Sequence, residues 1–480
     1  MSAIRIVCTI GPATNNAKAI QELVDAGMSV ARLNGSHSDL DWHADAIRTL
    51  RAVAPNIPIL LDIPGRKIRT GLLQIEPRFN AGDPITFTTD GDNDGSLKIP
   101  VSNVNLHKYL SVGDTIVADD GTLSFSVVHI EGRDINCRAE NAGQLKSRKG
   151  INVPHVSLKG DLITERDRNL IDFVREHEID FVGISFVESA AHVAAIRALI
   201  GSDWPRIVSK VENRGGIENL EEIVEASDAI MIDRGDLSVE TSLYDVALMQ
   251  RQIIEAGIRH AKPVIVATEM LHSMIHSPFP TKAEVSDITH AVLDGCAATM
   301  LSGETAVGVN PSAAVQLMRR VVDAAERYVQ TNLNNDDLQF AMKAPEAMAE
   351  ATALIGRRVP ITKIVVFTRT GYAARMIASR RPKQPILAVS DNAMAARSFN
   401  LIAGTTGFFM DSTFARTSTD HIADGLERLW RASLISDDDM ILVTGLGYPN
   451  SGNRFNLIQV HNVMDLIETL GWRQTMRRAS

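Results

Sequence analysis

The stretches R-I-V-S-K-V-E-N at residues 206–213 and D-A-I-M-I-D-R-G-D at 228–236 decide the fold of this chain. Each contains a short run of apolar and β-branched residues, as a fully buried parallel strand does. The residues between them, at about 216–226, follow a helical pattern, so the two runs predict a strand–helix–strand unit. Both runs pass directly into charged residues, which places charged groups at the carboxyl ends of the two strands.

The same unit recurs along most of the chain. Strands are predicted at 4–10, 29–33, 57–62, 179–185, 206–211, 229–232, 263–268 and 297–301. Helices are predicted at about 16–26, 38–53, 189–200, 216–226, 244–259, 282–294 and 311–330, some with good N-cap residues such as Ser189. Eight strands alternating with helices favour a closed (β/α)8 TIM barrel with right-handed crossovers. An open doubly wound sheet is the alternative, although it rarely has so many regular units.

The alternation stops at two places, and each predicts a further domain. Residues 71–155 read as short strands separated by D-G and E-G-R turns, so we expect a small β-barrel lid domain inserted after the third barrel strand. The polar run T-N-L-N-N-D-D at 331–337 reads as a linker before a second α/β unit. The predicted domains are a barrel of 1–70 and 156–335, a lid of 71–155 and a C-terminal α/β domain of 336–480.

Composition narrows the classes of function. The chain has 480 residues and a net charge of −9, which opposes general nucleic-acid binding but not a local basic pocket. Its three cysteines lie far apart in apolar runs, which predicts buried reduced thiols rather than disulfides or a metal site. Without a signal peptide or an apolar run of about 20 residues, we expect a cytoplasmic protein that does not cross a membrane.

Nearly every predicted barrel strand ends at a titratable or hydroxyl-bearing residue, and barrel active sites lie at this end. Glu212 and Asp236 suit a hard divalent cation such as Mg²⁺. Lys210 faces the same side as Glu212, where it could stabilise charge on a transferring phosphoryl group. Arg32 suits a phosphate or carboxylate clamp, and Thr268 suits a proton relay. The alternatives are solvated loop carboxylates, structural ion pairs of Lys210 and Arg32, and a helix cap at Thr268.

The loop after the third strand, L-D-I-P-G-R-K-I-R-T-G at 61–71, carries three cations, Arg66, Lys67 and Arg69. Basic, glycine-containing loops at strand ends often hold phosphate. No histidine pair has zinc-binding spacing, so His37 and His43 are expected to make local hydrogen bonds. The residues alone therefore predict a Mg²⁺-dependent barrel enzyme that acts on a small phosphorylated anion under a hinged lid.

Motifs along essentially the whole chain resemble those of the pyruvate kinase family, in the same order. They are I-V-C-T-I-G-P-A-T (6–14), A-R-L-N-x-S-H (31–37), L-K-S-R-K-G-I-N-V-P (145–154), S-K-V-E-N (209–213), R-G-D-L (234–237), K-P-V-I-V-A-T-E-M-L-x-S-M-I (262–275), P-T-K-A-E-V-S-D (280–287) and M-L-S-G-E-T-A-x-G (300–308). The resemblance implies phosphoryl transfer from phosphoenolpyruvate to ADP, giving pyruvate and ATP. It also implies Mg²⁺ or Mn²⁺ as cofactor, a homotetramer, and a sugar-phosphate or nucleotide effector at the C-terminal domain.

The resemblance also assigns roles to single positions. Arg32 would contact the substrate phosphate, Lys210 would stabilise the transferring phosphoryl group, and Thr268 would help protonate the enolate. Glu212 and Asp236 would hold the metal ion. The remaining positions are Ser185, Gly235 and Asp236 at the substrate, Arg69, Lys149, Asn34 and His37 at the nucleotide, and Asn34, Ser36, Asp62 and Lys67 in the monovalent-cation region.

Two replacements bear on the monovalent cation. The family loop usually reads L-D-T-K-G-P-E-I-R-T-G, so Ile63 replaces a threonine ligand and Lys67 replaces a glutamate. An ammonium group is itself a fixed monovalent cation, able to supply the charge of K⁺ beside Asp62. Family members with lysine here are generally K⁺-independent, so we expect that this chain does not require K⁺.

Other departures concern the substrate and the effector. Asp233 replaces a usual alanine and Glu269 a usual glutamine, and these added carboxylates should weaken binding of an anionic substrate unless each is paired. One hypothesis pairs Arg234 with Glu269, either across a subunit interface or within the chain. Gly35 replaces a usual phenylalanine, and the effector loop at 368–373 lacks one hydroxyl.

Three alternatives to an active pyruvate kinase remain at this point. The first is a related phosphotransferase or regulatory homologue with an altered substrate. The second is a lyase or aldolase that uses a metal-bound enolate, which would leave Arg69 and Lys149 without a role. A non-enzymatic interaction protein is the weakest, because a binding scaffold has no need of Lys210, Glu212 and Thr268 together.

Overall fold

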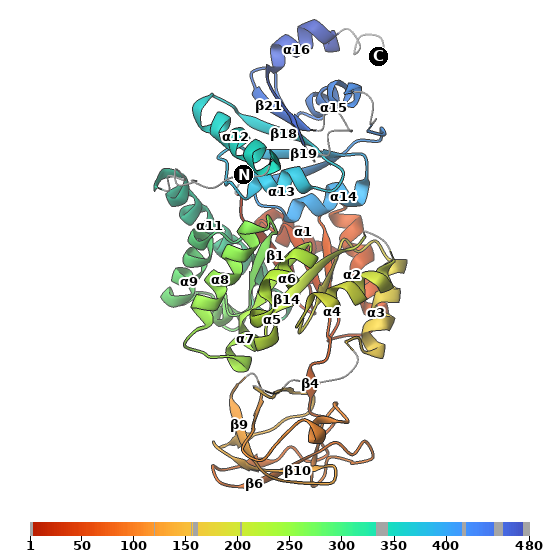
Figure 1. Ribbon diagram of the computed structural model, residues 1–480, viewed down its shortest axis with the longest axis vertical. Helices are drawn as coiled ribbons and strands as arrows, with labels where there is room; N and C mark the ends of the chain where they lie inside the picture. Colours follow the sequence, from red (N-terminus) through yellow and green to blue (C-terminus); the bar gives the residue numbers. More distant parts are fainter. Residues whose placement is uncertain are drawn as a thin grey trace.

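The computed structural model describes residues 3–119, 121–154, 156, 162–201, 204–332, 344–414, 419–445 and 455–473. Figure 1 shows an inserted β domain at one end of a central barrel and an α/β domain at the other end. Hydrophobic clusters fill these three parts, and the cluster of the inserted domain contains Phe87 and Phe125. The inserted domain and the C-terminal domain therefore lie on opposite sides of the barrel.

The central part is a closed barrel, as predicted. Its strands are β1 (Arg5–Thr9), β2 (Val30–Asn34), β3 (Ile59–Ile63), β13 (Phe181–Ile184), β14 (Arg206–Val211), β15 (Ala229–Asp233), β16 (Val264–Ala267) and β17 (Ala298–Leu301). They follow the order β1-β17-β16-β15-β14-β13-β3-β2, and the pairings are parallel. The strands are buried on both faces, which explains their continuous apolar sequences.

In the sequence the helices of this part lie between its strands, and in space they surround the barrel. They are α1 (Ala17–Ala26), α2 (Leu40–Val53), α3 (Glu165–Glu176), α4 (Ala190–Ile200), α5 (Arg214–Glu218), α6 (Leu220–Ala226), α7 (Arg234–Glu240), α8 (Val246–Arg259), α9 (Lys282–Asp294), α10 (Gly303–Ala306) and α11 (Pro311–Asn332). The sequence prediction omitted α3, α7 and α10, and it merged α5 with α6. The pattern before α3 did hold a signal, since Thr164 and Asp167 form a capping box.

The inserted domain is built from short strands, as predicted. Its seven-stranded sheet has the order β4-β12-β8-β9-β10-β6-β7, and β5 pairs separately with β11. The strands are β4 (Ile68–Arg69), β5 (Arg78–Phe79), β6 (Pro84–Thr88), β7 (Ile99–Pro100), β8 (Thr115–Ala118), β9 (Leu123–Glu131), β10 (Asp134–Ala139), β11 (Gly143–Gln144) and β12 (Gly150–Asn152). A bridge between Thr70 and Val101 joins the two edges, so the sheet curls into a small barrel. Its entry and exit strands, β4 and β12, are antiparallel neighbours.

The C-terminal domain is a five-stranded sheet of order β20-β19-β18-β21-β22, parallel except for the last pair. Its strands are β18 (Lys363–Phe367), β19 (Ile386–Ser390), β20 (Thr405–Phe409), β21 (Met440–Gly445) and β22 (Leu457–Asn462). Its helices are α12 (Ala344–Arg358), α13 (Tyr372–Ala378), α14 (Ala393–Ser398), α15 (Asp420–Arg431) and α16 (Val463–Leu470). Most of the predicted linker at 331–337 lies outside the described residues.

A buried carboxylate joins the C-terminal domain to the barrel. Asp180, which precedes β13, accepts hydrogen bonds from Arg51 on α2 (2.6 Å) and Arg397 on α14 (3.0 Å). The main-chain N–H of Ile59 also donates to it at 2.9 Å. Asp180 is fully buried, so the two guanidinium groups balance its charge and fix the domains against each other.

Two predictions about the whole chain can be compared with the structure. The three cysteines are free and buried, as expected, and burial raises the pKa of Cys137 and of Cys296 to about 12. Among the described residues, no helix combines the length and the apolar character needed to span a membrane.

Candidate functional site

The carboxyl ends of the barrel strands meet on the side of the inserted domain (Figure 1). At this end lie most of the residues singled out from the sequence, namely Arg32, Asp62, Ser185, Lys210, Glu212, Asp236 and Thr268. Arg32, Asp62, Lys210 and Glu212 are at most 6% exposed although all four can carry a charge. Burying charges is costly unless they are paired, so their partners define the site.

The ammonium group of Lys210 lies at the centre of the site. Its Nζ lies 3.0 Å from Glu212 Oε2, 3.0 Å from Asp233 Oδ2 and 3.3 Å from Ser185 Oγ. Burial alone would lower the pKa of Lys210, but the two carboxylates outweigh it and raise this pKa above its ordinary value. Lys210 therefore stays charged, and β14 and β15 hold it in a fixed direction.

Three carboxylates form a cluster suited to a metal ion. Oxygen atoms of Glu212, Asp233 and Asp236 lie within 4.8 Å of one another. Glu212 Oε2 is buried and accepts no hydrogen bond from the described residues, despite its closeness to Lys210. Burial and the neighbouring acids raise the pKa of Glu212 to about 8 although Lys210 and Lys67 oppose this, so the nearby cations do not fully balance the cluster. A hard divalent cation would supply the missing positive charge, so the residues fit one.

Arg32 and Asp62 form a buried ion pair across β2 and β3. The guanidinium group lies 2.8 Å (Nε) and 2.7 Å (Nη2) from Asp62 Oδ2, and Nη1 donates to Thr9 Oγ1 at 3.0 Å. Asp62 Oδ1 is buried and has no hydrogen-bond partner in the described part of the chain. It points at Gly183, where an added Cβ would lie 2.0 Å away, so β13 needs glycine at this point.

The three cations of the loop at 61–71 have three different partners. Lys67 Nζ lies 2.7 and 2.8 Å from the two carboxylate oxygens of Asp236, and 5.6 Å from the centre of the Phe186 ring. Its ion pair is thus with Asp236, while Asp62 pairs with Arg32. Arg66 contacts Glu188 at 3.1 Å, and Arg69 donates to the main chain of Arg148 at 3.1 Å.

Thr268 and Gly235 meet at the mouth of the barrel. The main-chain N–H of Gly235 donates to Thr268 Oγ1 at 2.9 Å, and this hydroxyl donates to the carbonyl of Ala267 at 2.6 Å. Thr268 and Glu269 both have positive φ, at 67° and 56°. Left-handed backbone at two successive non-glycine residues is strained, and such strain concentrates at functional sites. Sequence patterns carry no signal for this feature.

The residues assigned to the nucleotide lie where the lid joins the barrel. Arg69 on β4 pairs in register with Gly150 on β12, and Lys149 forms an ion pair with Asp119 at 2.6 Å. Asn34 accepts a hydrogen bond from the main chain of Ser36 at 3.1 Å. Arg69 lies on β4 and Lys149 directly precedes β12, the two strands that connect the lid, so lid movement would carry both of them together.

The two predicted histidines make the local contact that was expected. His43 Nε2 lies 3.0 Å from the carbonyl oxygen of His37. Burial, followed by the nearby charges of Arg69, Arg32 and Arg166, lowers the pKa of His37. His37 is therefore neutral at physiological pH, close to the cations of the site.

The hypothesis that Arg234 pairs with Glu269 is wrong within this chain. Arg234 is buried and pairs instead with Asp287 on α9 at 2.6 Å, and it also donates to the carbonyl of Thr268 at 2.6 Å. Glu269 is exposed. The left-handed backbone at Thr268 and Glu269 changes the direction of the chain here, which spacing alone does not reveal.

Two other departures gain a physical explanation. Asp233 pairs with Lys210, and burial, which would raise its pKa, is outweighed by Lys210, Lys67 and Arg32, so the pKa of Asp233 falls to about 2. The sequence prediction gave the metal cluster only Glu212 and Asp236 and missed this third carboxylate. At Gly35, an added Cβ would lie 2.4 Å from the carbonyl oxygen of Asp62, so this backbone leaves no room for a larger residue.

Comparisons with known proteins agree with this geometry. Residues 1–315 match the family model of the pyruvate kinase barrel domain, and residues 346–461 match that of the pyruvate kinase alpha/beta domain. A pyruvate kinase of Bacillus licheniformis is 36% identical, over 97% of this chain and 81% of the relative, and one of Thermococcus litoralis is 35% identical, over 92% and 94%. A crystal structure of a pyruvate kinase from Cryptosporidium parvum superposes with a TM-score of 0.84 at 33% identity, covering 96% of each chain. The chain therefore belongs to the pyruvate kinase family of phosphotransferases.

Proposed function

We propose that this chain transfers the phosphoryl group of phosphoenolpyruvate to ADP, forming pyruvate and ATP. The observation that carries the proposal is the position of Lys210. Its ammonium group is buried between Glu212 and Asp233, 3.0 Å from each, at the mouth of the barrel. A fixed positive charge in a water-poor site suits phosphoryl transfer, where catalysis consists mainly of positioning and charge stabilisation.

The other side chains would divide the remaining tasks. Arg32 would exchange part of its contact with Asp62 for the substrate phosphate, which a guanidinium group can bind through two hydrogen bonds. The main-chain N–H of Gly235 would receive the substrate carboxylate, and Ser185 would lie beside it. When Gly235 turns to the carboxylate, the Thr268 hydroxyl loses a donor and becomes free to take part in moving a proton to the enolate.

Glu212 and Asp236, with Asp233 beside them, would hold a divalent cation, either Mg²⁺ or Mn²⁺. Such a cation supplies positive charge that neutralises substrate oxygens during phosphoryl transfer. Lys67 occupies both oxygens of Asp236, so it would have to yield that carboxylate, at least in part, when the site is loaded. Arg69 and Lys149, with Asn34 and His37, would bind the nucleotide.

K⁺ independence is also part of the proposal. Lys67 brings a permanent positive charge into the carboxylate cluster, and Ile63 offers no ligand oxygen. We expect activity to change less than about twofold when K⁺ is replaced by tetramethylammonium, because the charge is built into the chain. Lys67→Met should lower activity in both salts, whereas Arg66→Met, which removes the neighbouring cation of the same loop, should not. Strong activation of the unaltered chain by K⁺ would overturn this part.

Membership of the family is the basis for three further proposals, which concern the oligomeric state, the location and the effector. We propose a homotetramer in the cytoplasm, with a sugar phosphate or nucleotide as effector at the C-terminal domain. The loop at 368–373 that would receive the effector contains a hydrogen bond from the N–H of Gly371 to Thr368 Oγ1 at 3.1 Å.

A coupled assay that reduces the pyruvate formed tests the reaction. With phosphoenolpyruvate and ADP, the chain should turn over in the presence of Mg²⁺ and stop when a chelator removes it. Lys210→Met should lower kcat by about 1,000-fold or more, because the charge at the reacting group is lost. Lys98→Met removes a lysine paired with Asp134 on the lid and should leave kcat unchanged.

The same assay distinguishes the proposed reaction from that of a related phosphotransferase with an altered substrate. Absence of turnover with folded, Mg²⁺-loaded protein would contradict the proposed reaction. Turnover with another phosphorylated donor in its place would identify the chain as a related phosphotransferase with an altered substrate.

A further inference from the structure

The ammonium group of Lys67 is held by a carboxylate that has a second use. Its Nζ lies 2.7 and 2.8 Å from the two oxygens of Asp236, which is one of the proposed ligands of the divalent cation. A metal ion bound there would compete with Lys67, since both cations need the same oxygens. Lys67 therefore needs another partner if its charge is to stay in the site together with the metal ion.

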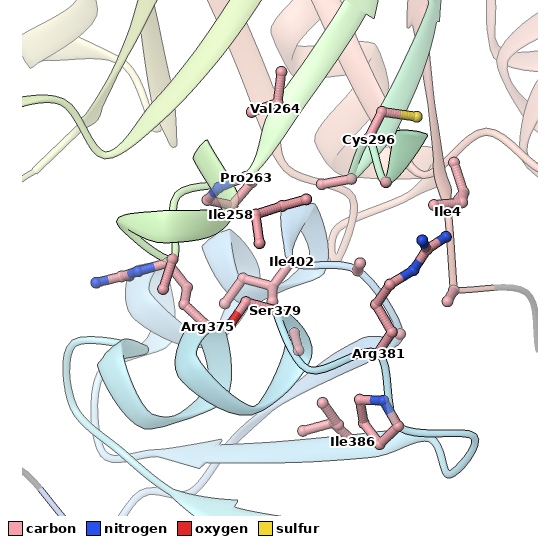
Figure 2. A pocket seen from close by; sticks show the side chains of 18 of the residues that line it. Ile4, Ile258, Pro263, Val264, Cys296, Arg375, Ser379, Arg381, Ile386 and Ile402 are labelled. Carbon is pink, nitrogen blue, oxygen red and sulfur yellow. The ribbon is translucent and has the colours of Figure 1, made fainter. Parts of the chain in front are cut away.

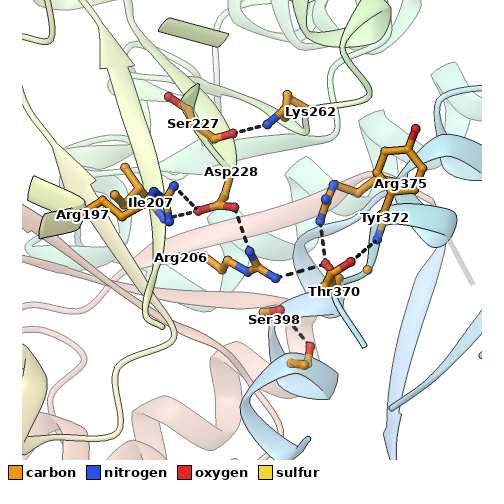
Figure 3. Close-up of polar contacts among 12 residues, drawn as sticks. Arg197, Arg206, Ile207, Ser227, Asp228, Lys262, Thr370, Tyr372, Arg375 and Ser398 are labelled. Carbon is orange, nitrogen blue, oxygen red and sulfur yellow. Dashed lines mark hydrogen bonds and ion pairs between the residues drawn. The ribbon is translucent and has the colours of Figure 1, made fainter. Parts of the chain in front are cut away.

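Two other cations of the chain have partners away from the carboxylate cluster. Figure 3 shows Arg206 against Asp228, 3.0 Å away, where the barrel meets the C-terminal domain. Figure 2 shows Arg381 at a pocket between the same two domains, and it donates to the carbonyl of Val292 at 2.9 Å. Neither partner is a proposed metal ligand, so these contacts do not compete with a metal ion. The contact of Lys67 does.

The aromatic ring of Phe186 offers Lys67 a partner that no metal ion takes. Lys67 Nζ lies 5.6 Å from the centre of this ring, near the outer limit of about 6 Å for attraction between a cation and an aromatic face. The contact can therefore shorten when Lys67 leaves Asp236. A hard divalent cation prefers oxygen ligands, so it would leave the ring to the lysine.

The main chain of Phe186 is fixed to the other proposed metal ligand. Its N–H donates to Glu212 Oε1 at 2.7 Å, and its φ of 54° is left-handed, which is unfavourable for a bulky residue. A hydrogen bond to a buried carboxylate is strong enough to help maintain such a conformation. The ring of Phe186 is thus attached to the metal site through its own backbone.

Two glycines allow Lys67 to reach this ring. Gly65 has φ of 61°, and a Cβ there would lie 2.7 Å from the carbonyl oxygen of Ser185, so glycine lets the loop at 61–71 pass close to the end of β13. A Cβ added at Gly150 on β12 would lie 2.8 Å from Lys67 Cε. The stem of Lys67 therefore runs across the strand by which the lid returns to the barrel.

We propose that Phe186 is a positioning residue that holds the ammonium group of Lys67 in the site when a divalent cation occupies Asp236. The inference rests on the proposed function, since it takes Asp236 as a metal ligand. Phe186 acts through Lys67 and needs no contact with the reacting atoms. Its ring lets the built-in monovalent charge and the divalent cation be present together. Without the ring, Lys67 would release Asp236 less readily, and the metal ion would bind more weakly.

Mn²⁺ binding measured by electron paramagnetic resonance tests the proposal without any turnover. Phe186→Leu removes the ring but keeps an apolar side chain, and it should weaken Mn²⁺ binding about threefold, as loss of a cation–aromatic contact would. Phe186→Tyr keeps the ring and should bind Mn²⁺ as the unaltered chain does. The matched control is Phe409→Leu, at an exposed phenylalanine that ends β20 in the C-terminal domain, and it should leave the affinity unchanged.

The dependence on Lys67 separates this role from a general effect of the ring on packing. In a Lys67→Met background the ring has no cation to hold, so adding Phe186→Leu should change Mn²⁺ affinity by less than about 1.5-fold. Phe186→Met, which also lacks a ring, takes the place of Phe186→Leu if that variant does not fold. Equal weakening with and without Lys67, equal weakening in Phe186→Tyr, or unchanged affinity in Phe186→Leu would each overturn the proposal.

The same measurements distinguish this inference from the proposed reaction. Mn²⁺ binding that follows these expectations in a chain without turnover would support the role of Phe186 and contradict the reaction alone. Absence of Mn²⁺ binding by the unaltered chain would overturn both, because the carboxylate cluster would then hold no metal ion.

Discussion

At the scale of single residues, the cations of the candidate site each contact one or two of its carboxylates. Lys210 has two carboxylate partners, and Lys67 has a third. Relative to the usual family sequence, the chain has gained one cation at Lys67 and one acid at Asp233, and both now lie in the same cluster. The added acid therefore does not simply repel an anionic substrate, because it is held by a lysine.

Replacing Asp233 tests what this acid contributes. Asp233→Ala should weaken Mn²⁺ binding by about tenfold, which corresponds to about 1.4 kcal/mol, because a third carboxylate attracts the cation. Electron paramagnetic resonance of Mn²⁺ gives this affinity without an activity assay. kcat should fall by less than about threefold, since alanine is the usual family residue.

Glu269→Gln is the control for this variant. It removes the other added acid, which is exposed and outside the three-carboxylate cluster. Its Mn²⁺ affinity should equal that of the unaltered chain. An equal weakening in both variants would mean that Asp233 acts only through the overall charge.

At the scale of elements, the start of helix α3 is hydrogen-bonded to the loop at 61–71, which leads from the barrel to the inserted domain. Thr164 accepts from the N–H of Asp167 at 3.1 Å, and the Asp167 carboxylate accepts from the N–H groups of Thr164 (2.9 Å) and of Gly65 (3.0 Å). Gly65 belongs to the loop that carries Lys67. The start of one helix thus fixes the loop that supplies a cation to the site.

A pair of helix-cap variants measures this contribution. Thr164→Ala should lower the free energy of unfolding by about 1 kcal/mol, because the cap hydrogen bond is lost. Ser189→Ala should change it by less than about 0.3 kcal/mol, because Ser189 precedes α4 without making a side-chain cap bond. Urea unfolding followed by circular dichroism provides both values, and equal effects would contradict the cap as the cause.

The exit strand of the lid contacts the helix that carries Asp236. Asn152 on β12 donates to Glu240 Oε1 on α7 at 2.7 Å. Burial, with the charge of Asp236, raises the pKa of Glu240 to about 7 despite this hydrogen bond. The folded chain then binds a proton between about pH 4.5 and 7 that the unfolded chain releases, so Glu240 makes stability fall as pH rises through this window.

Glu240→Gln should remove that pH dependence. Glutamine keeps an acceptor for Asn152 but carries no charge, so the variant should melt a few degrees higher than the unaltered chain at pH 8 and about equally at pH 4.5. Thermal unfolding at the two pH values tests this expectation. A melting difference that is the same at both would show that the carboxyl does not titrate as described.

The sequence predicted the regular elements well and the contacts between them less well. The eight barrel strands were recognisable because a strand buried on both faces is a continuous apolar run, as at β14. Strand ends also located Lys210, Glu212 and Arg32. The partner of Arg234, the position of Lys67 on Asp236 and the strain at Thr268 were not predictable, because each depends on how separate loops meet in space.

At the scale of the whole molecule, the barrel is fixed to the C-terminal domain through Asp180. Asp180→Asn should strongly destabilise this junction, because Arg51 and Arg397 then face each other without a buried negative charge between them. Breaking one partner of a buried pair typically costs about 3–5 kcal/mol. We expect the first thermal transition to fall by about 5 °C or more.

Calorimetry would record this shift, and separation into two transitions would locate it at the junction. Asp172→Asn provides the comparison, because Asp172 forms an exposed pair with Arg175 at 3.7 Å on α3. Its transition should move by less than about 1 °C, since exposed pairs contribute little. Equal shifts in the two variants would contradict the role given to Asp180.

The neighbouring strands β4 and β12 make the inserted domain modular. Because Arg69 pairs antiparallel with Gly150, and Ile68 with Ile151, the chain leaves the barrel and returns to it at one point. A two-residue hairpin turn would span the gap left by deleting the domain, as in any antiparallel pair. Removing the whole inserted domain at this point would leave the order of the barrel strands on either side unchanged.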